Sequence, residues 1–243
     1  MTPQNKPVLL FDLDGTLVNS APDLALAVNA TLRDLHRDEF DQETIHLWVG
    51  NGAKTLIERA LSGSVIIDDY LDADLAKQAL RMFLAHYEQN LCIESCLYQN
   101  VESTLHSLKK AGYRLAIITN KPEVFVHPII TVLNIGSLFE LILGGDSLTE
   151  RKPSPLPLLH ACAQLGVLPH DCLMIGDSKN DILAAKAANI QSIGLTYGYN
   201  YGEDIGVYQP DWRFEHFNDL LSILETTNEN NRINIKNIQE YAC

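Results

Sequence analysis

An uninterrupted apolar run near the start of the chain, residues 8–11, ends abruptly in the polar residues 12–16. Four consecutive large apolar residues are typical of a strand that is buried on both faces of a parallel sheet, where polar and apolar positions do not alternate. Ligands bind outside the carboxyl ends of the strands in such sheets. Asp12 and Asp14 are two residues apart, so we expect both carboxylates to face one site at this strand end.

A helical pattern of apolar positions follows this strand. Ser20, Pro22 and Asp23 provide an N-cap serine, an early proline and an acidic first turn, which predict the start of a helix. The short apolar run 65–67 is the strongest strand-like signal in this region. We interpret residues 19–91 as a helical cap domain that is inserted after the first strand. The helices expected within it cover residues 20–35, 41–48, 53–61 and 71–90.

Apolar runs and helical segments alternate again beyond the cap. This alternation with short loops predicts an α/β fold, a doubly wound, Rossmann-like parallel sheet with right-handed crossovers. We expect residues 1–18 and 92–225 to form this core domain, and the polar residues 226–243 to form a tail. The expected strands cover residues 115–118, 141–143, 173–175, 193–195 and 212–214, and the expected helices cover residues 101–111, 124–133, 156–165 and 180–188.

The composition is that of a globular protein large enough to bury a real core. The chain has 243 residues, of which 46% are hydrophobic and 20% charged. It has no apolar stretch of the ~20 residues that a membrane span requires, and its first residues do not resemble a signal peptide, so we expect a cytoplasmic protein and no membrane partner. The net charge of −13 argues against binding to a nucleic-acid backbone. Any phosphate that the protein binds must therefore be held locally.

The cysteines and histidines do not indicate a metal site. Five cysteines without a Cys-x-x-Cys pair argue against a disulfide framework and a structural zinc site, so we expect them to be small buried hydrophobes. The eight histidines are scattered without ligand spacing. The cysteines are Cys92, Cys96, Cys162, Cys172 and Cys243.

Candidate chemistry lies instead where strands or loops end in polar residues. Carboxylates, a hydroxyl, an amide and an amine follow apolar runs that one parallel sheet would bring to the same edge. Their occurrence in this order after apolar runs indicates one functional site at that edge. The residues concerned are Asp12 and Asp14, Thr119 and Asn120, Lys152, and Asp177 with Asp181.

Each of these residues alone also fits an ordinary role. Thr119 and Asn120 could form a turn or a helix cap, Lys152 could be a solvated surface charge, and Asp177 could cap the following helix. An Asp-x-Asp-Gly run also opens calcium loops, but such a loop needs a preceding helix and a closing glutamate, where this chain has Asp23. The occurrence of the whole set in this order favours a functional site.

The set resembles the four motifs of the haloacid dehalogenase superfamily of phosphohydrolases: an Asp-x-Asp-x-Thr strand end, a strand-terminal Thr or Ser, a Lys, and an acidic Gly-Asp-x-x-x-Asp loop. The helical insertion resembles the first type of cap in that superfamily. More narrowly, residues 12–24, 49–53 and 197–202 are similar to bacterial phosphoglycolate phosphatases. The resemblance covers about residues 6–225, and Asn19 departs from it where the family usually has an aspartate.

This resemblance implies Mg²⁺-dependent hydrolysis of a small phosphomonoester, with 2-phosphoglycolate as the substrate. Asp12 would attack phosphorus and form an aspartyl phosphate, and Asp14 would act as the general acid and base. Asp12, the backbone carbonyl of Asp14, and Asp177 would hold the Mg²⁺ ion.

The resemblance also assigns the groups that surround the substrate. Thr119, Asn120 and Lys152 would bind the transferring phosphoryl oxygens, and Asp181 would orient Lys152 or a metal-bound water. Substrate preference would come from the cap. There, glycines at the start of a helix allow backbone N–H groups to approach a small carboxylate. The cap residues expected to contribute are Gly50, Asn51, Gly52 and Lys54.

Three other functions are compatible with parts of this pattern. A signalling receiver domain also places acidic residues, a Thr and a Lys around an aspartyl phosphate, but its acceptor usually follows a later strand and it has no cap. A phosphomutase or a C–P bond hydrolase could use the same core, and for the latter Lys54 would have to supply the amine. An anion-binding protein without chemistry is the remaining alternative. The sequence leaves the oligomeric state open.

Overall fold

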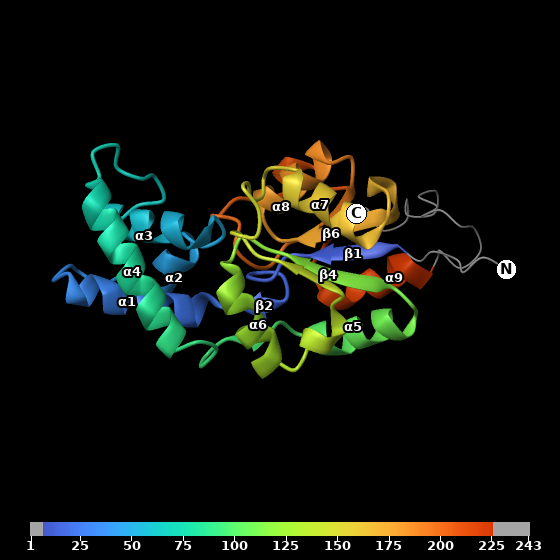
Figure 1. Ribbon diagram of the computed structural model, residues 1–243, viewed down its shortest axis with the longest axis horizontal. Coiled ribbons are helices and arrows are strands. Elements are labelled where there is room, and N and C mark those ends of the chain that lie inside the picture. The colour runs from blue at the N-terminus through green and yellow to red at the C-terminus, as the bar shows by residue number, and fades with distance from the viewer. Residues whose placement is uncertain (1–6, 226–243) are drawn as a thin grey trace.

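The computed structural model describes residues 7–225, so the predicted tail at 226–243 lies outside the described residues. A six-stranded sheet in the order β5-β4-β1-β6-β7-β8 forms the centre of the core, and every pair of neighbouring strands is parallel (Figure 1). The prediction of a doubly wound parallel sheet is therefore confirmed. The strands are β1 Val8–Phe11, β4 Arg114–Ile118, β5 Leu141–Leu143, β6 Cys172–Gly176, β7 Gln191–Leu195 and β8 Trp212–Phe214.

Helices cover both faces of this sheet. Helices α7 (Leu156–Leu165) and α8 (Lys179–Ala187) pack on one face, where Val8 and Leu10 of β1 point. The other face, where Leu9 and Phe11 point, is covered by three helices below the sheet in Figure 1. Because β1 is apolar on both faces, it can occupy the middle of the sheet. The three helices on the second face are α5 Val101–Lys110, α6 Glu123–Val132 and α9 Leu220–Glu225.

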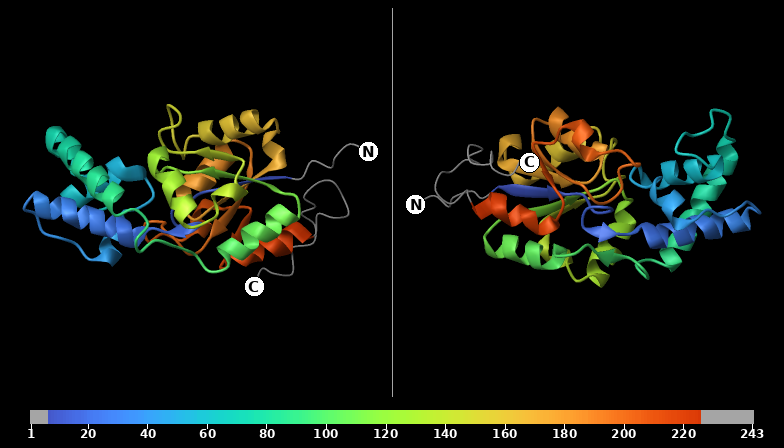
Figure 2. Two further views of the ribbon diagram at one scale, coloured as in Figure 1. Left: turned by 60° about the horizontal axis from the view of Figure 1, so that its bottom comes forward. Right: turned by 180° about the vertical axis from the view of Figure 1, so that it is seen from behind.

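The cap consists of four helices that lie to one side of the core, as the views in Figures 1 and 2 agree. Helix α1 packs against α4 and α2, and α3 packs against α4, around an apolar centre that includes Val28, Ile57 and Phe83. All four helices were predicted, whereas residues 65–67 form no strand and the side chain of Ile66 is exposed. The cap helices are α1 Ala21–Asp34, α2 Gln42–His46, α3 Gly52–Ser62 and α4 Ala73–Gln89.

Two short strands join the cap to the core. Strands β2 (Val18–Asn19) and β3 (Cys96–Leu97) form an antiparallel ladder between the two chain connections. The sequence does not predict them, because two residues are too few for a periodic pattern. We propose that the cap begins and ends at this ladder, close to the predicted limits of 19–91.

Several smaller features differ from the sequence expectations. Cys162 and Cys172 are buried with their Sγ atoms 3.4 Å apart, but Cys96 is exposed, so the expectation of uniformly buried cysteines is wrong. Helix α9 and the 3-10 helices were not predicted. Within residues 7–225, no helix has the length and apolar character of a membrane span. The 3-10 helices are η1 Gly136–Leu138, η2 Pro169–Asp171, η3 Ile205–Tyr208 and η4 Phe217–Asp219.

The first turn of α1 is hydrogen-bonded to residues 94 and 95, where the chain returns from the cap to the core. The Asp23 carboxylate is fully buried and accepts hydrogen bonds from the Glu94 amide (2.8 Å), the Ser95 amide (3.0 Å) and the Ser95 hydroxyl (2.5 Å). The single carboxylate of Asp23 therefore accepts hydrogen bonds from three donors of the segment that leads from the cap back to the core.

We expect Asp23→Ala to lower the free energy of unfolding by about 2–4 kcal/mol, because buried donors then lose their acceptor. Chemical denaturation of the purified variant measures this effect. Asp38→Ala is the matched control, since the Asp38 side chain is exposed, and it should change stability by less than about 0.5 kcal/mol. Equal stability of the two variants would show that the three hydrogen bonds to Asp23 do not stabilise the fold.

Candidate active site

The candidate site lies at the carboxyl ends of three adjacent strands. Strand β1 pairs with β4 on one side and β6 on the other, in parallel. Asp12, Thr119 and Asp177 each directly follow one of these strands. The sheet order therefore brings together residues that lie far apart in the sequence, as their positions after apolar runs predicted.

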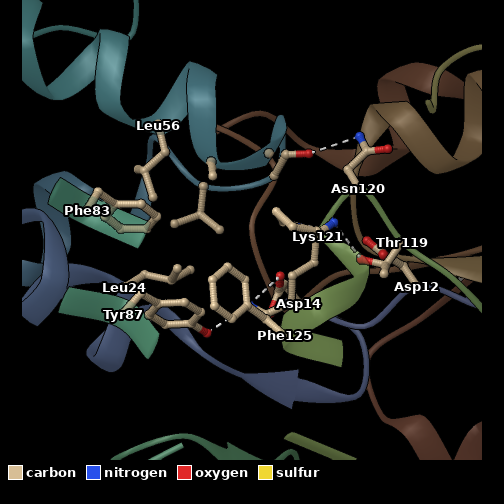
Figure 3. A pocket seen from close by; sticks show the side chains of 15 residues that line it. Asp12, Asp14, Leu24, Leu56, Phe83, Tyr87, Thr119, Asn120, Lys121 and Phe125 are labelled. Atoms are coloured by element: carbon tan, nitrogen blue, oxygen red, sulfur yellow. Dashed lines mark hydrogen bonds and ion pairs between the residues drawn. The ribbon is translucent and has the colours of Figure 1, made fainter. Parts of the chain in front are cut away.

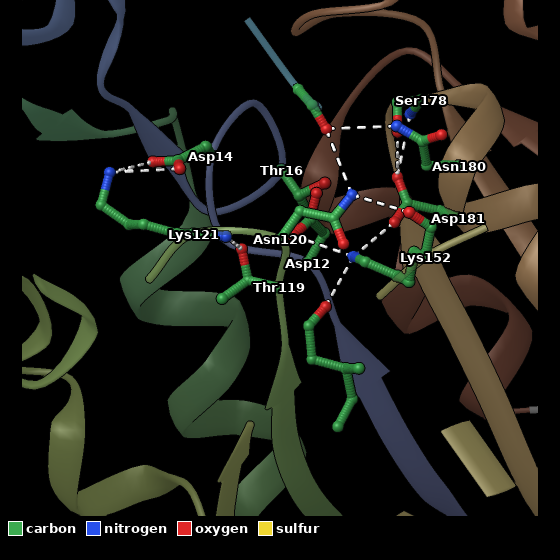
Figure 4. Close-up of polar contacts among 12 residues, drawn as sticks. Asp12, Asp14, Thr16, Thr119, Asn120, Lys121, Lys152, Ser178, Asn180 and Asp181 are labelled. Atoms are coloured by element: carbon green, nitrogen blue, oxygen red, sulfur yellow. Dashed lines mark hydrogen bonds and ion pairs between the residues drawn. The ribbon is translucent and has the colours of Figure 1, made fainter. Parts of the chain in front are cut away.

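Lys152 lies at the centre of the acidic residues and is 2% exposed. Its Nζ atom lies 3.0 Å from Asp12 Oδ1 and 2.6 Å from Asp181 Oδ1, and it donates to the carbonyl oxygen of Ile118 at 2.6 Å (Figure 4). A solvated surface charge, the ordinary alternative for Lys152, is therefore excluded. The ammonium group thus joins the carboxylate at the end of β1 to a carboxylate in the first turn of α8.

Both carboxylate oxygens of Asp177 accept short hydrogen bonds. Its Oδ1 atom accepts a hydrogen bond from Thr16 Oγ1 and its Oδ2 atom accepts one from the Tyr199 amide, both at 2.6 Å. The N-cap residue of α8 is Ser178, so the alternative that Asp177 caps this helix is wrong.

Glycine is required at two positions beside this carboxylate. Gly15 and Gly198 both have positive φ angles, of 90° and 97°. A Cβ atom on Gly15 would lie 2.2 Å from Asp177 Oδ2, and one on Gly198 would lie 2.5 Å from it. Both the backbone conformation and the close approach exclude a side chain there.

Burial of these acids leaves their negative charge poorly compensated. Burial raises the pKa of Asp12 to about 6, although Lys152 acts in the opposite direction. Burial also raises the pKa of Asp177 well above its ordinary value, and the nearby Asp181 and Asp12 carboxylates raise it further. The site would therefore gain stability from an additional cation.

The residues present fit a divalent metal ion. Carboxylate oxygens of Asp12, Asp177 and Asp181 lie within 4.8 Å of one another. Asp12 Oδ1 is buried and accepts no hydrogen bond from the described residues, only the ion pair with Lys152. Oxygen donors of this kind suit Mg²⁺. Asp181 is less available than the other two acids, because Lys152 occupies its Oδ1 atom and Ser178 occupies its Oδ2 atom.

Asp14 has partners that the sequence analysis did not assign. Its carboxylate accepts a 2.6 Å hydrogen bond from Ser20 Oγ and lies 3.1 and 3.2 Å from Lys121 Nζ. Ser20 does occupy the N-cap position of α1, but its hydroxyl bonds to Asp14 and not to the helix. Lys121 also donates to the Tyr87 hydroxyl of α4 at 2.8 Å. Lys121 thus links a core carboxylate to the cap.

Lys121 is 5% exposed and carries its positive charge inside the protein. Burial alone lowers the pKa of its amine, but the Asp14 carboxylate and the Tyr87 hydroxyl raise it by more, so the pKa lies above its ordinary value. One sequence signal could have identified this residue, since it follows Thr119 and Asn120 at the end of a strand neighbouring β1.

A small cavity separates these groups from the cap (Figure 3). It offers about 40 Å³ of space to water-sized atoms. Asp12, Asp14, Thr119 and Lys121 line its core side, and the apolar side chains of the cap line the opposite side. The apolar lining comes mainly from Leu24, Val49, Leu56 and Phe83 of the cap and from Phe125 of the core.

The loop before α3 closes one end of this cavity. Gly50 and Gly52 line it, as expected for cap residues near the substrate. The Gly50 carbonyl oxygen accepts hydrogen bonds from Asn180 Nδ2 (3.1 Å) and Asn120 Nδ2 (3.4 Å). Asn120 Nδ2 also donates to the Lys152 carbonyl oxygen at 2.9 Å. The Asn120 amide therefore bridges cap and core in this arrangement, and its predicted contact with phosphate stays a prediction.

The two other cap candidates lie outside the cavity lining. Lys54 points to solvent, with 68% of its side chain exposed, and lies 3.6 Å from Glu58 as an exposed ion pair. Asn51 is the N-cap residue of α3, and its buried Oδ1 atom accepts no hydrogen bond from the described residues. A substrate contact by either side chain is not part of this geometry and stays a prediction.

Comparison with known proteins decides the family. The family model described as haloacid dehalogenase-like hydrolase matches residues 9–195. The chain belongs to the haloacid dehalogenase-like hydrolase family. It is 68% identical over 222 residues to a protein of Colwellia psychrerythraea named phosphoglycolate phosphatase, covering 91% of this chain and 98% of that relative. A Mannheimia succiniciproducens protein of the same name is 47% identical, with 88% and 96% covered.

Solved structures of this hydrolase family share the fold. A predicted phosphoglycolate phosphatase from Haemophilus somnus 129pt superposes with a TM-score of 0.83 at 44% identity, covering 90% of this chain and 98% of that one. CbbY from Rhodobacter sphaeroides, solved in complex with phosphate, superposes with a TM-score of 0.70 at 27% identity, with 88% and 96% covered. The family and the capped fold expected from the sequence motifs are thus confirmed.

We expect Lys152→Met to lower the free energy of unfolding of the metal-free protein by about 3–5 kcal/mol, because it leaves the buried Asp12 and Asp181 carboxylates without their cation. Denaturation in the presence of a chelator measures this loss. Lys77→Met removes an exposed lysine of α4 and should have almost no effect. A Lys152→Met protein as stable as the parent would show that the ion pairs do not hold the site together.

Proposed function

We propose that this protein is a phosphatase that hydrolyses 2-phosphoglycolate to glycolate and inorganic phosphate in the cytoplasm, with Mg²⁺ as cofactor. The observation that carries this proposal is that Asp12 and Asp14 both line a small cavity closed by the cap. Asp12 is held by the core lysine, Lys152, and Asp14 by the lysine that contacts the cap, Lys121. The two carboxylates thus have separate surroundings, as two different chemical roles require.

In the first half of the reaction Asp12 attacks phosphorus. A bond forms between an Asp12 carboxylate oxygen and phosphorus, and the bond from phosphorus to the glycolate oxygen breaks. Asp14 enters this step protonated and donates its proton to the departing oxygen, so glycolate leaves with a neutral hydroxyl. The hydrogen bond from Ser20 and the contact with Lys121 hold Asp14 in place for this transfer.

In the second half water replaces the enzyme oxygen. Asp14 accepts a proton from the water as it attacks phosphorus, and the bond between phosphorus and Asp12 breaks. Inorganic phosphate leaves and both carboxylates return to their starting states. Lys152 contacts Asp12 throughout and would balance negative charge on the transferring group. Thr119 lines the same cavity and would contribute its hydroxyl to the phosphoryl oxygens.

Asp12 and Asp177, with the backbone carbonyl of Asp14, would hold the Mg²⁺ ion. When bound there, Mg²⁺ supplies charge neutralisation that lets a carboxylate approach an anionic phosphoester. Three carboxylates and one ammonium group around the proposed ion leave an excess of two negative charges, which one divalent cation balances. The residues counted are Asp12, Asp177, Asp181 and Lys152.

The lining of the cavity supports a compact substrate. Side chains of the cap face Asp12 and Asp14 across the cavity, so a bulky leaving group would have to displace them. A two-carbon leaving group needs less of this room than a hexose does. The relative that is 68% identical over most of this chain carries the name of an enzyme acting on a substrate of this size.

The geometry disfavours the alternatives. A C–P bond hydrolase needs an uncharged amine at its site, but Lys54 lies in solvent and Lys121 is paired with Asp14. A receiver domain needs an open phosphoacceptor, whereas the cap lies over Asp12 here. Hydrolysis therefore remains the activity that fits the arrangement best.

We expect 2-phosphoglycolate to have the highest kcat/KM in a phosphate-release panel that includes a hexose phosphate and a nucleotide, because its short leaving group displaces the cap side chains that line the cavity least. Asp12→Asn keeps the side-chain size but removes the nucleophile, so it should reduce kcat by at least about 10³-fold for every substrate. A higher kcat/KM for the hexose phosphate than for 2-phosphoglycolate would overturn the substrate assignment. An Asp12→Asn variant with most of its kcat would overturn the mechanism.

We expect Asp177→Asn to raise the Mg²⁺ concentration for half-maximal activity by about 10–100-fold, because it removes an anionic metal ligand. Its matched control is Asp171→Asn, an exchange of a partly exposed aspartate just before β6, which should leave the Mg²⁺ dependence unchanged. Titration of activity with Mg²⁺ after treatment with a chelator measures both. Identical titration curves for the parent and Asp177→Asn would exclude Asp177 as a metal ligand.

A further inference from the structure

Lys121 places a buried positive charge on the wall of the cavity. Its Nζ atom donates to the Tyr87 hydroxyl at 2.8 Å and contacts the two Asp14 oxygens at 3.1 and 3.2 Å, so its three N–H donors have three acceptor atoms. The two Asp14 contacts are the longer ones and go to a single carboxylate. A ligand carboxylate in the cavity can therefore replace one of them while the ion pair with Asp14 remains.

The Tyr87 hydroxyl has an unused donor at the same place. Its hydroxyl oxygen accepts the hydrogen bond from Lys121, and its own proton has no acceptor among the described residues. Burial raises the pKa of Tyr87 to about 12, so the hydroxyl keeps this proton at neutral pH. The ring stacks on Phe83 at 5.7 Å and meets the edge of Phe125 at 5.1 Å, which fixes its position.

These donors lie where the distal part of a small substrate must be. The proposed acid, Asp14, has to contact the oxygen of the leaving group. In 2-phosphoglycolate a single carbon separates that oxygen from the carboxylate, so the carboxylate lies within a few ångströms of Asp14. Lys121 Nζ is 3.1 Å from the Asp14 carboxylate, and Lys121 is the one cationic residue among the described cavity-lining residues (Figure 3).

We propose that Lys121 and Tyr87 bind the carboxylate of the substrate and set the preference for 2-phosphoglycolate, a role that the sequence analysis gave to Gly50, Asn51, Gly52 and Lys54 of the cap. This inference rests on the proposed function. Lys121 belongs to the core and Tyr87 to the cap, so a substrate carboxylate bound by both bridges the two parts of the protein. A phosphoester without this carboxylate forms neither bond.

The test compares two substrates of equal length on the same enzyme. The carboxylate of 2-phosphoglycolate is replaced by a neutral hydroxymethyl group in 2-hydroxyethyl phosphate, and the readout is the ratio of their kcat/KM values. We expect Lys121→Met to reduce this ratio by roughly 10–100-fold, and Tyr87→Phe by a few-fold, as expected for a charged and a neutral hydrogen bond to a carboxylate. Lys121→Arg keeps the charge and should retain most of the preference.

A merely structural role for Lys121 predicts a different result. If Lys121 only holds Asp14 in place, Lys121→Met slows both substrates equally and the ratio stays at the parent value, which would overturn the inference. A loss of the preference in Lys54→Met, with a normal ratio in Lys121→Met, would overturn it as well. If Lys121→Met does not fold, the ratio in Tyr87→Phe decides alone, because this exchange removes one oxygen and leaves the ring packing.

The failure of this inference can be distinguished from the failure of the proposed function. A parent enzyme that shows no preference for 2-phosphoglycolate over 2-hydroxyethyl phosphate contradicts the proposed substrate, and this inference falls with it. A parent enzyme that shows the preference, together with Lys121→Met and Tyr87→Phe variants that keep it, contradicts only the assignment of these two side chains. Lys77→Met is the control for removal of a lysine, because Lys77 lies on the exposed face of α4.

Discussion

The ion pairs of Lys152 are the interaction on which the rest of the site depends. Burying carboxylates side by side is costly unless a cation lies among them. Lys152 Nζ contacts Asp12 and Asp181 and is fixed by a backbone carbonyl oxygen of β4. These contacts exist only because β1 lies between β4 and β6. The topology of the sheet is therefore a condition for the chemistry, and the remaining negative charge explains why the site suits a divalent cation.

The two buried lysines differ in the parts of the protein that they contact. Within the described part of the chain, the Lys152 ammonium group contacts Asp12, Asp181 and the Ile118 carbonyl oxygen, which all belong to the core. Lys121 contacts Asp14 on the core and Tyr87 on the cap. Contacts of Asn180 with the Gly50 carbonyl join the same two parts. The cap thus contributes to the surroundings of Asp14, whereas the pair of Lys152 with Asp12 is formed within the core.

The sequence predicts the parts of this molecule that local patterns encode. Apolar runs identify the strands, and polar residues directly after them identify Asp12, Thr119 and Asp177, because strand ends of a parallel sheet share one edge. Contacts made by the tertiary fold have no such pattern. The Tyr199 amide on Asp177 and the Tyr87 hydroxyl on Lys121 come from segments far away in the sequence. Strands β2 and β3 were missed for a similar reason, since only their pairing defines them.

Lys54 and Lys121 are both candidates for binding the substrate carboxylate, and their burial distinguishes them. Lys54 follows a glycine-rich loop at the start of a helix, which is a reasonable local signal for anion binding, but its ammonium group lies in solvent beside Glu58. An ion pair in water contributes little and is screened by salt. Lys121 has a weaker local signal, its position after Thr119 and Asn120, yet its ammonium group is buried between Asp14 and the cap residue Tyr87, where the same interaction is several times stronger. The proposed preference for a charged substrate therefore relies on the buried lysine and not on the exposed one.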